Sequence, residues 1–276
     1  MSGIGVLGAG TMGAGIAYVF AVAGHPVHVV EPDAGRAAAL VPLLVRRAEK
    51  GIALGKIAAA DGLAERIRIV ADVESVPAGL DLVVESVPER IALKATVLAA
   101  AERRSPRLLA TNTSSLSIDE LASGLTRRER FLGMHFFNPV WAIGLVELVR
   151  GAATADAALF QAEGLARAIG KESIVVGDIP GFATSRLDTA IALEAMRMLD
   201  EGVSGAEEID RAACVAYGHP TGPLRLSDMV GLDVRLDVAR QLQSVHGERY
   251  APPPNLVRLV ERGHLGRKTG RGFYVW

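Results

Sequence analysis

Three glycines near the N-terminus constrain the fold more than any other feature. The apolar run at residues 4–7 is typical of a buried strand, and it leads into Gly8-Ala9-Gly10-Thr11-Met12-Gly13, which opens a helix predicted over residues 10–24. In such a unit the first glycine permits the tight turn, the second lets the backbone approach a pyrophosphate, and the third lets the helix pack on the strand. The helix N-terminus adds free N–H groups that favour phosphate. The pattern predicts a dinucleotide site built from Gly8, Gly10, Thr11, Met12 and Gly13.

An acidic residue follows the next predicted strand. Glu31 comes directly after residues 27–30 and 18 residues after Gly13. A carboxylate at this place accepts hydrogen bonds from the ribose hydroxyls and repels a 2′-phosphate. NAD is therefore expected rather than NADP. Arg36, on the following helix, is interpreted as part of a solvated helix face, with a phosphate contact as the alternative.

Short apolar runs alternate with helical patterns as far as residue 180. Such alternation is typical of a parallel sheet covered on both faces, and right-handed crossovers then give an α/β, Rossmann-type, doubly wound and mainly parallel sheet. We expect an NAD-binding domain at residues 1–180 and a smaller all-α domain at residues 181–276. The predicted strands are 4–7, 27–30, 67–70, 82–85, 108–111, 131–134, 145–149 and 174–176, and the helices of the second domain are 184–199, 206–217, 227–245 and 255–262.

Two local patterns refine the helical domain. Ser204 and Glu207 have the spacing of a capping box, which predicts the start of the helix at residues 206–217. One apolar face is expected on the helix at residues 184–199, formed by Leu187, Ile191, Ala195 and Met198.

Composition and charge exclude several classes of protein. The 30 Lys and Arg residues nearly balance the 31 Asp and Glu residues, so no overall basic field attracts nucleic acid or an anionic membrane. Residues 1–30 carry no Asp, Glu, Lys or Arg, as a membrane span would, but seven glycines and Pro26 interrupt them. The single cysteine, Cys214, excludes an internal disulfide, no metal-ligand motif occurs, and a reducing, cytoplasmic location is expected.

Polar residues follow two later strands, at the edge where a doubly wound sheet binds its ligands. Ser114 lies in the polar segment at residues 112–115, and His135 follows the strand at residues 131–134. Glu147 lies 12 residues further on, as the one acid in an apolar run. A buried carboxylate needs a partner, and a pair with His135 would orient the imidazole and raise its basicity. The alternatives are a core histidine and, at residues 112–115, a capped turn.

Several longer motifs are spread over essentially the whole chain. They are GAGTMG at 8–13, VESVPE at 84–89, NTSSL at 112–116, GMHFFNP at 133–139, PGF at 180–182, GHPTGP at 218–223 and GRKTGRGFY at 266–274. With these motifs in this order, the chain resembles the L-3-hydroxyacyl-CoA dehydrogenases, especially the bacterial 3-hydroxybutyryl-CoA dehydrogenases.

The resemblance implies NAD-dependent oxidation of an L-3-hydroxyacyl-CoA to the 3-oxoacyl-CoA, and the reverse reaction. His135 would be the general base for the 3-hydroxyl, Glu147 would hold and polarise it, and Ser114 would hydrogen-bond the reacting oxygen. Glu89, Lys94, Ser114 and Asn138 match positions that contact the cofactor, and Ser114 and Asn138 also match positions beside the substrate.

The resemblance also implies functional roles for Lys50 and for the second domain. Lys50 would meet the phosphates of the acyl-CoA substrate, the alternative being a solvated helix end. The helical domain would close over the substrate and form a homodimer.

One position departs from the family pattern. The family usually has Asn shortly after the Pro-Gly-Phe motif to orient the substrate, where this chain has Ser185. A hydroxyl has a shorter reach than an amide, so an altered substrate preference is expected.

Two rival interpretations of the function remain. One is an NAD-dependent dehydrogenase of a free hydroxy acid or sugar acid, and the other is a non-catalytic NAD-binding protein.

Overall fold

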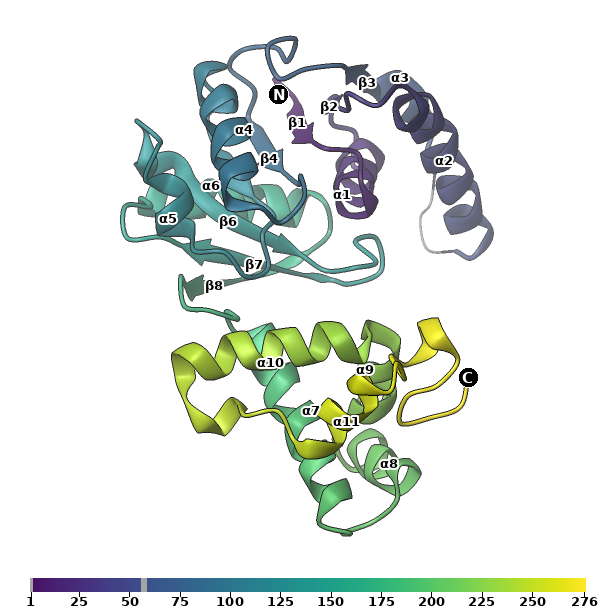
Figure 1. Cartoon of the computed structure of the whole chain (residues 1–276). Helices are drawn as coiled ribbons and strands as arrows, with labels where there is room; N and C mark the ends of the chain where they lie inside the picture. The colour runs from purple at the N-terminus through teal and green to yellow at the C-terminus, as the bar shows by residue number, and fades with distance from the viewer. Residues whose placement is uncertain (1, 56–58) are drawn as a thin grey trace. The chain divides into compact units, whose positions relative to one another are not determined.

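The chain folds into two compact units, Met1–Ile179 and Pro180–Trp276 (Figure 1). The structure is a computed structural model, and it describes residues 2–55 and 59–276. Within these residues, no helix has the length and apolar character needed to cross a membrane.

The first unit is built on one eight-stranded sheet with the order β3-β2-β1-β4-β5-β6-β7-β8. All neighbouring strands run parallel except β6 and β7, which are antiparallel. The predicted doubly wound, mainly parallel sheet is therefore confirmed. The strands are β1 Ile4–Leu7, β2 Val27–Val30, β3 Ile67–Val70, β4 Leu82–Glu85, β5 Leu109–Thr111, β6 Phe131–Phe136, β7 Leu145–Arg150 and β8 Glu172–Gly177.

Helices connect these strands and cover the sheet. The largest apolar cluster joins the strands to α1, α2 and α6, and it includes alternate strand residues such as Val6 and Val84. The intervening residues, such as Val83, point to the other face, where α4 contacts β4 and β5. The helices are α1 Thr11–Val22, α2 Ala34–Ala53, α3 Leu63–Arg66, α4 Ile91–Arg103, α5 Ile118–Ala122 and α6 Asp156–Ala168, with a 3-10 turn η1 at Arg128–Arg130.

The turn between β1 and α1 uses each of its three glycines differently. Gly8 has a φ of 100°, a backbone conformation that L side chains rarely adopt. A Cβ on Gly13 would lie 1.8 Å from the carbonyl oxygen of Gly8, so only glycine permits this helix–strand contact. A Cβ on Gly10 would meet no atom within 4 Å. The backbone beside Gly10 is thus open to a ligand, while Gly13 serves packing.

The second unit contains helices only, apart from isolated bridges near its end. Its core includes Leu193, Met196, Leu224 and Leu236. The helices are α7 Thr184–Asp200, α8 Ala206–Tyr217, α9 Pro223–Val230, α10 Leu232–His246 and α11 Pro254–Glu261, with 3-10 turns η2 Glu248–Tyr250 and η3 Arg267–Thr269.

Three expectations about this unit were wrong. The helix predicted at residues 227–245 is two helices, because Gly231 has a φ of 109° and interrupts the α-helical path. The cap of α8 is Gly205 rather than Ser204, and no side chain caps the helix. Of the predicted apolar face of α7, Ala195 is buried and Met198 packs against the core, but Leu187 and Ile191 are exposed. Leu193 and Met196 are buried instead.

We expect Gly13→Ala to destabilise the first unit far more than Gly10→Ala. The methyl group on residue 13 must displace the backbone of Gly8, and overpacking of this kind costs at least about 2–3 kcal/mol. The methyl group on residue 10 enters open space, so its cost is about 1 kcal/mol or less, the ordinary loss on replacing glycine by alanine at a helix N-cap. Urea unfolding of both variants measures the difference. Equal stabilities would contradict the assigned contact between Gly13 and Gly8.

Candidate active site

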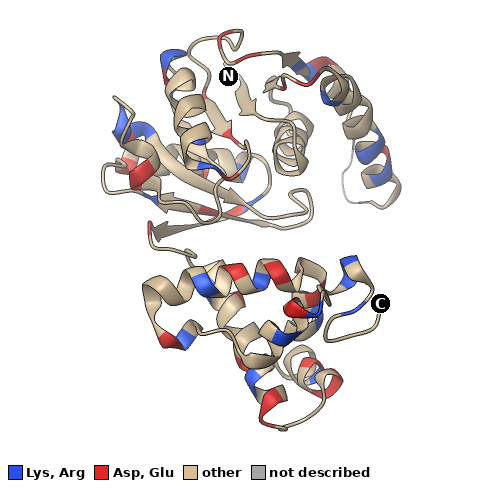
Figure 2. Cartoon of the chain, viewed as in Figure 1, with Lys and Arg blue, Asp and Glu red and all other residues tan. Residues whose placement is uncertain are grey.

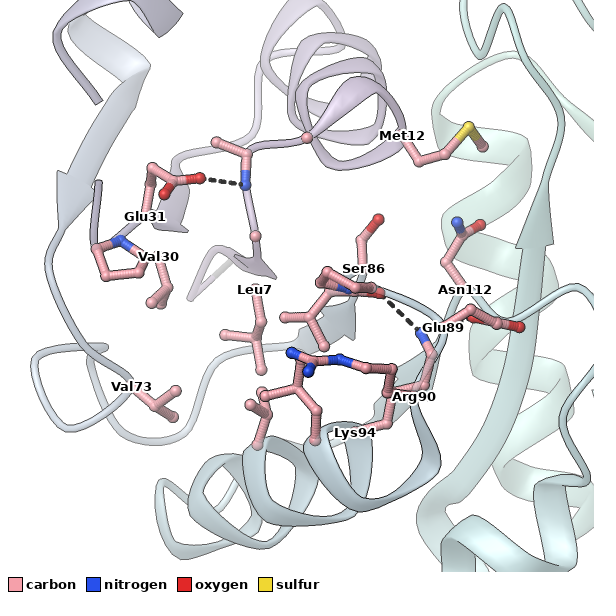
Figure 3. A pocket seen from close by; sticks show the side chains of 18 of the residues that line it. Leu7, Met12, Val30, Glu31, Val73, Ser86, Glu89, Arg90, Lys94 and Asn112 are labelled. Carbon is pink, nitrogen blue, oxygen red and sulfur yellow. Dashed lines mark hydrogen bonds and ion pairs between the residues drawn. The ribbon is translucent and has the colours of Figure 1, made fainter. Parts of the chain in front are cut away.

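A cavity of about 1300 Å³ lies in the first unit where the strands β1, β2, β4, β5 and β6 end (Figure 3). Because parallel strands share one direction, their carboxyl ends form one edge, and the residues that follow them meet there. Most of the residues predicted from the sequence line this cavity. They are Gly8, Gly10, Thr11, Met12, Glu31, Glu89, Lys94, Ser114, His135 and Asn138.

The glycine turn fits a dinucleotide pyrophosphate. Gly10 is the N-cap of α1 and lines the cavity, and it brings no side chain to cap the first N–H groups of the helix. Those N–H groups and the helix dipole favour an anion at this end. The open space around Gly10 gives a phosphate room to approach.

Glu31 lies beside this turn at the end of β2, and its side chain is 4% exposed. Its Oε2 accepts a hydrogen bond from the N–H of Ala9 at 3.2 Å (Figure 3). Its Oε1 accepts from the N–H of Asp33 at 2.9 Å. Arg36 donates to the same Oε1 at 2.9 Å. The Arg36 hydrogen bond, together with those from the backbone, outweighs burial and holds the pKa of Glu31 below its ordinary value. The carboxylate is thus ionised and fixed.

His135 and Glu147 form a buried pair across two strands. They are directly opposite each other in the antiparallel register of β6 and β7. Nδ1 of His135 lies 2.7 Å from Oε2 of Glu147, whose side chain is 0% exposed. A carboxylate accepts only, so the neutral imidazole carries its proton on Nδ1 and its lone pair on Nε2. This arrangement suits a proton acceptor, because Glu147 stabilises the imidazolium that forms.

The loop that carries Ser114 is held by Glu89. Oε1 of Glu89 accepts hydrogen bonds from the Thr113 hydroxyl, from the N–H of Ser114 at 3.2 Å and from the Ser115 hydroxyl at 3.1 Å. Burial raises the pKa of Glu89, but the Thr113 hydrogen bond and the charge of Lys94 outweigh it and leave the pKa below its ordinary value. Glu89 is therefore an anion that fixes the loop at the cavity wall.

Lys94 stabilises this loop through its ion pair with Glu89. Its side chain is 1% exposed, and its Nζ lies 2.8 Å from Oε1 of Glu85 and 3.1 Å from Oε2 of Glu89. Glu85, which is 0% exposed, also accepts a hydrogen bond from the Thr111 hydroxyl at 2.7 Å. The ammonium thus links the ends of β4 and β5 to the loop of Ser114.

Glu85 and Asn112 belong to the site, although sequence analysis gave neither a role. Glu85 is a lone acid at the end of an apolar strand, the same signal that identified Glu147, so the signal was available. Asn112 accepts a hydrogen bond from the N–H of Phe136 at 2.9 Å and thereby joins the ends of β5 and β6. No local pattern marks that contact, because it depends on strand order.

Four predicted residues do not line this cavity. Glu147 is fully buried against His135. Gly13 is buried under the turn and serves packing. Lys50 is exposed on α2 and lines a second cavity of about 960 Å³, together with Arg46, Arg47 and Lys171. Basic residues gather along this part of α2 (Figure 2). Ser185 is the second residue of α7, in the C-terminal unit.

A metal centre finds no support among the side chains of residues 2–55 and 59–276. No group of three His, Cys, Asp or Glu residues within that part of the chain is arranged to hold an ion.

Comparison with known proteins gives matches over nearly the whole chain. The family "3-hydroxyacyl-CoA dehydrogenase, NAD binding domain" matches residues 3–179, and "3-hydroxyacyl-CoA dehydrogenase, C-terminal domain" matches residues 181–276. A 3-hydroxybutyryl-CoA dehydrogenase of Mycobacterium tuberculosis is 38% identical, over 99% of this chain and 98% of its own. A probable 3-hydroxybutyryl-CoA dehydrogenase of Bacillus subtilis is 39% identical, over 98% and 95%. The solved (S)-3-hydroxybutyryl-CoA dehydrogenase of Ralstonia eutropha is 37% identical, with a TM-score of 0.93 and coverage of 100% and 99%.

We expect Lys94→Met to cost about 3–5 kcal/mol of unfolding free energy, because it leaves the Glu85 carboxylate buried without its cation. The double variant Glu85→Gln/Lys94→Met removes both charges and keeps an acceptor for Thr111, so it should recover most of that loss. Arg103→Met is the matched control on the same helix, since the pair of Arg103 with Glu74 is more than 60% exposed on both sides. Its cost should stay below about 1 kcal/mol.

Urea unfolding measures all three variants. If the double variant were no more stable than Lys94→Met, the loss would come from packing rather than from the buried charge.

Proposed function

The chain belongs to the 3-hydroxyacyl-CoA dehydrogenase family and is an NAD-binding oxidoreductase, and we propose that it oxidises short-chain L-3-hydroxyacyl-CoA, with 3-hydroxybutyryl-CoA as the first candidate. One observation carries the proposal. His135 lines the cavity beside the glycine turn, and its Nδ1 is held at 2.7 Å by the fully buried Glu147. The names of the most similar relatives support the substrate class.

In the proposed mechanism, His135 accepts the proton of the 3-hydroxyl through Nε2. Bound NAD supplies the chemistry of hydride acceptance from C3. Glu147 keeps the proton of the imidazole on Nδ1 and offsets the positive charge that the ring gains, which favours proton transfer. Ser114, whose loop Glu89 fixes, hydrogen-bonds the reacting oxygen. In the reverse direction the imidazolium returns the proton to the 3-oxo group.

The cofactor is proposed to lie along the first cavity. The N–H groups of Thr11 and Met12 at the start of α1 would receive the pyrophosphate, and Glu31 would accept from the adenosine ribose. Glu89, Lys94, Ser114 and Asn138 would hold the nicotinamide end. Lys94 contributes mainly through Glu89, because its ammonium is 1% exposed.

The acyl-CoA phosphates are proposed to meet Lys50. The second cavity supports this proposal, because Arg46 and Arg47 line the same wall and supply further positive charge. Lys171 is buried at the cavity, where its Nζ donates to the carbonyl oxygens of Val140 and Ile143. Burial lowers the pKa of Lys171.

The C-terminal unit is proposed to close over the substrate and to form a homodimer. Large apolar side chains on its helices support association, since Leu187 is 65%, Val215 78% and Tyr217 80% exposed. A cytoplasmic location remains a prediction from the single cysteine.

The direct test follows NADH absorbance with acetoacetyl-CoA, and with NADPH and free acetoacetate as controls. We expect rapid oxidation of NADH with the thioester alone. His135→Gln should lower kcat by about 100-fold to 10,000-fold, the usual contribution of a general base, while NADH binding, measured by fluorescence, survives. Comparable turnover of free acetoacetate would favour the free-acid dehydrogenase, and NADH binding without turnover would favour the non-catalytic protein.

Ser185→Asn tests the departure from the family. If residue 185 orients the substrate, the longer amide should change kcat/KM for at least one acyl-CoA by about tenfold, the value of one hydrogen bond of about 1–2 kcal/mol. The measurement compares acetoacetyl-CoA with longer 3-oxoacyl-CoA substrates. A change below twofold for every substrate would exclude this position from substrate binding.

A further inference from the structure

Arg36 lies beside Glu31, the residue proposed to accept hydrogen bonds from the adenosine ribose. It belongs to the first turn of α2 and lines the first cavity. Its Nη2 lies 2.9 Å from Oε1 of Glu31, and its side chain is 61% exposed, compared with 4% for Glu31. A guanidinium has five N–H donors, and this contact uses one of them. Arg36 therefore remains available to a second anion without losing its contact with the carboxylate.

Glu31 and Arg36 have opposite effects on the binding of a nucleotide with a 2′-phosphate. The carboxylate accepts from a 2′-hydroxyl and repels a 2′-phosphate, whereas a guanidinium binds phosphate strongly and in a planar, two-pronged geometry. Because the two side chains form an ion pair, their own two charges largely offset each other. The repulsion that Glu31 alone would exert on a 2′-phosphate is therefore weakened.

The other charged residues around this end of the cavity do not offer a second cation in the place of Arg36. Asp72 and Glu74 line the cavity and are acidic, and Arg103 pairs with Glu74 at 3.3 Å. Asp33 accepts from the N–H of Arg36 at 2.8 Å and caps α2. Arg90 lines the cavity, but it lies along α4 and away from Glu31 (Figure 3).

We propose that Arg36 is the specificity-determining receptor for a 2′-phosphate, and that Glu31 opposes it. The natural chain binds NADP through Arg36 as a weaker second nucleotide, and loss of the Glu31 carboxylate reverses the preference. This inference rests on the proposed place of the ribose beside Glu31. The ligand class is that of 2′-phosphorylated adenine nucleotides, which Arg36 selects for and Glu31 selects against.

Isothermal titration calorimetry with NAD and NADP tests the proposal without turnover. Glu31→Ser should weaken NAD binding by about tenfold and shift the ratio of the two dissociation constants by at least about tenfold toward NADP, since each step removes or frees one charge-assisted hydrogen bond. Arg36→Ala should weaken NADP binding by about tenfold and NAD binding by less than about threefold. The double variant should lose the shift toward NADP that Glu31→Ser shows.

Two further variants act as controls. Arg107→Ala removes an arginine of similar exposure (69%, compared with 61% for Arg36) outside the cavity, where it pairs with Asp81 at 3.6 Å. It should leave both affinities unchanged. In Glu31→Ser/Arg90→Ala the shift toward NADP should persist, because Arg36 remains. Thermal unfolding of each variant establishes that it is folded, and Glu31→Gln replaces Glu31→Ser if the latter is not.

Three results would overturn the proposal. The shift toward NADP could persist without Arg36, or disappear on loss of Arg90, and either would assign the phosphate to another cation. If Glu31→Ser left NAD binding unchanged, the ribose would lie elsewhere and the role of Arg36 would fall with it. Turnover of NADH with acetoacetyl-CoA is measured separately, so that result would not bear on the proposed reaction.

Discussion

The buried ion pair of Glu85 and Lys94 is the interaction on which the site depends. Glu85 ends β4, and its neighbours in register are Leu7, just before the glycine turn, and Thr111, just before the loop of Ser114. Lys94 binds Glu85 and also Glu89, which holds that loop. The ammonium of Lys94 thus joins the end of β4, which lies beside the glycine turn, to the loop of Ser114. A buried pair adds little net stability, because desolvation offsets the attraction, but it fixes position.

Glu147 and Glu85 are both buried carboxylates paired with a basic side chain, but the two pairs have different properties. Both side chains are 0% exposed, and each has a basic partner within hydrogen-bonding distance. The partner decides what the pair can do. Lys94 donates to both Glu85 and Glu89 and so links the two carboxylates, whereas His135 uses only Nδ1 for Glu147 and has a second ring nitrogen that can exchange a proton with a substrate. Glu31 differs from both, since its partner Arg36 is largely exposed and remains open to ligands.

Local patterns predicted the strands well. The predicted ranges at residues 4–7, 27–30, 67–70 and 82–85 agree with β1 to β4. The strands β1, β2 and β4 are almost wholly buried and therefore apolar almost throughout. β3 lies at the edge of the sheet and exposes Arg68, but its other three residues are β-branched. The helical unit was harder. The apolar period continues through residue 231, and only the backbone conformation of Gly231 separates α9 from α10. Leu187 and Ile191 have the right spacing for a buried face, yet packing selects Leu193 and Met196.

The glycine turn, the strand–helix alternation and the residue types at the strand ends all follow from the amino-acid sequence alone. These are local properties, since a turn or a buried strand depends on a few consecutive residues. The tertiary structure decided which of those residues meet. His135 faces Glu147 through the antiparallel register of β6 and β7, and Lys94 reaches Glu85 because α4 packs on β4. Such contacts depend on strand order and on helix packing, which no stretch of consecutive residues encodes.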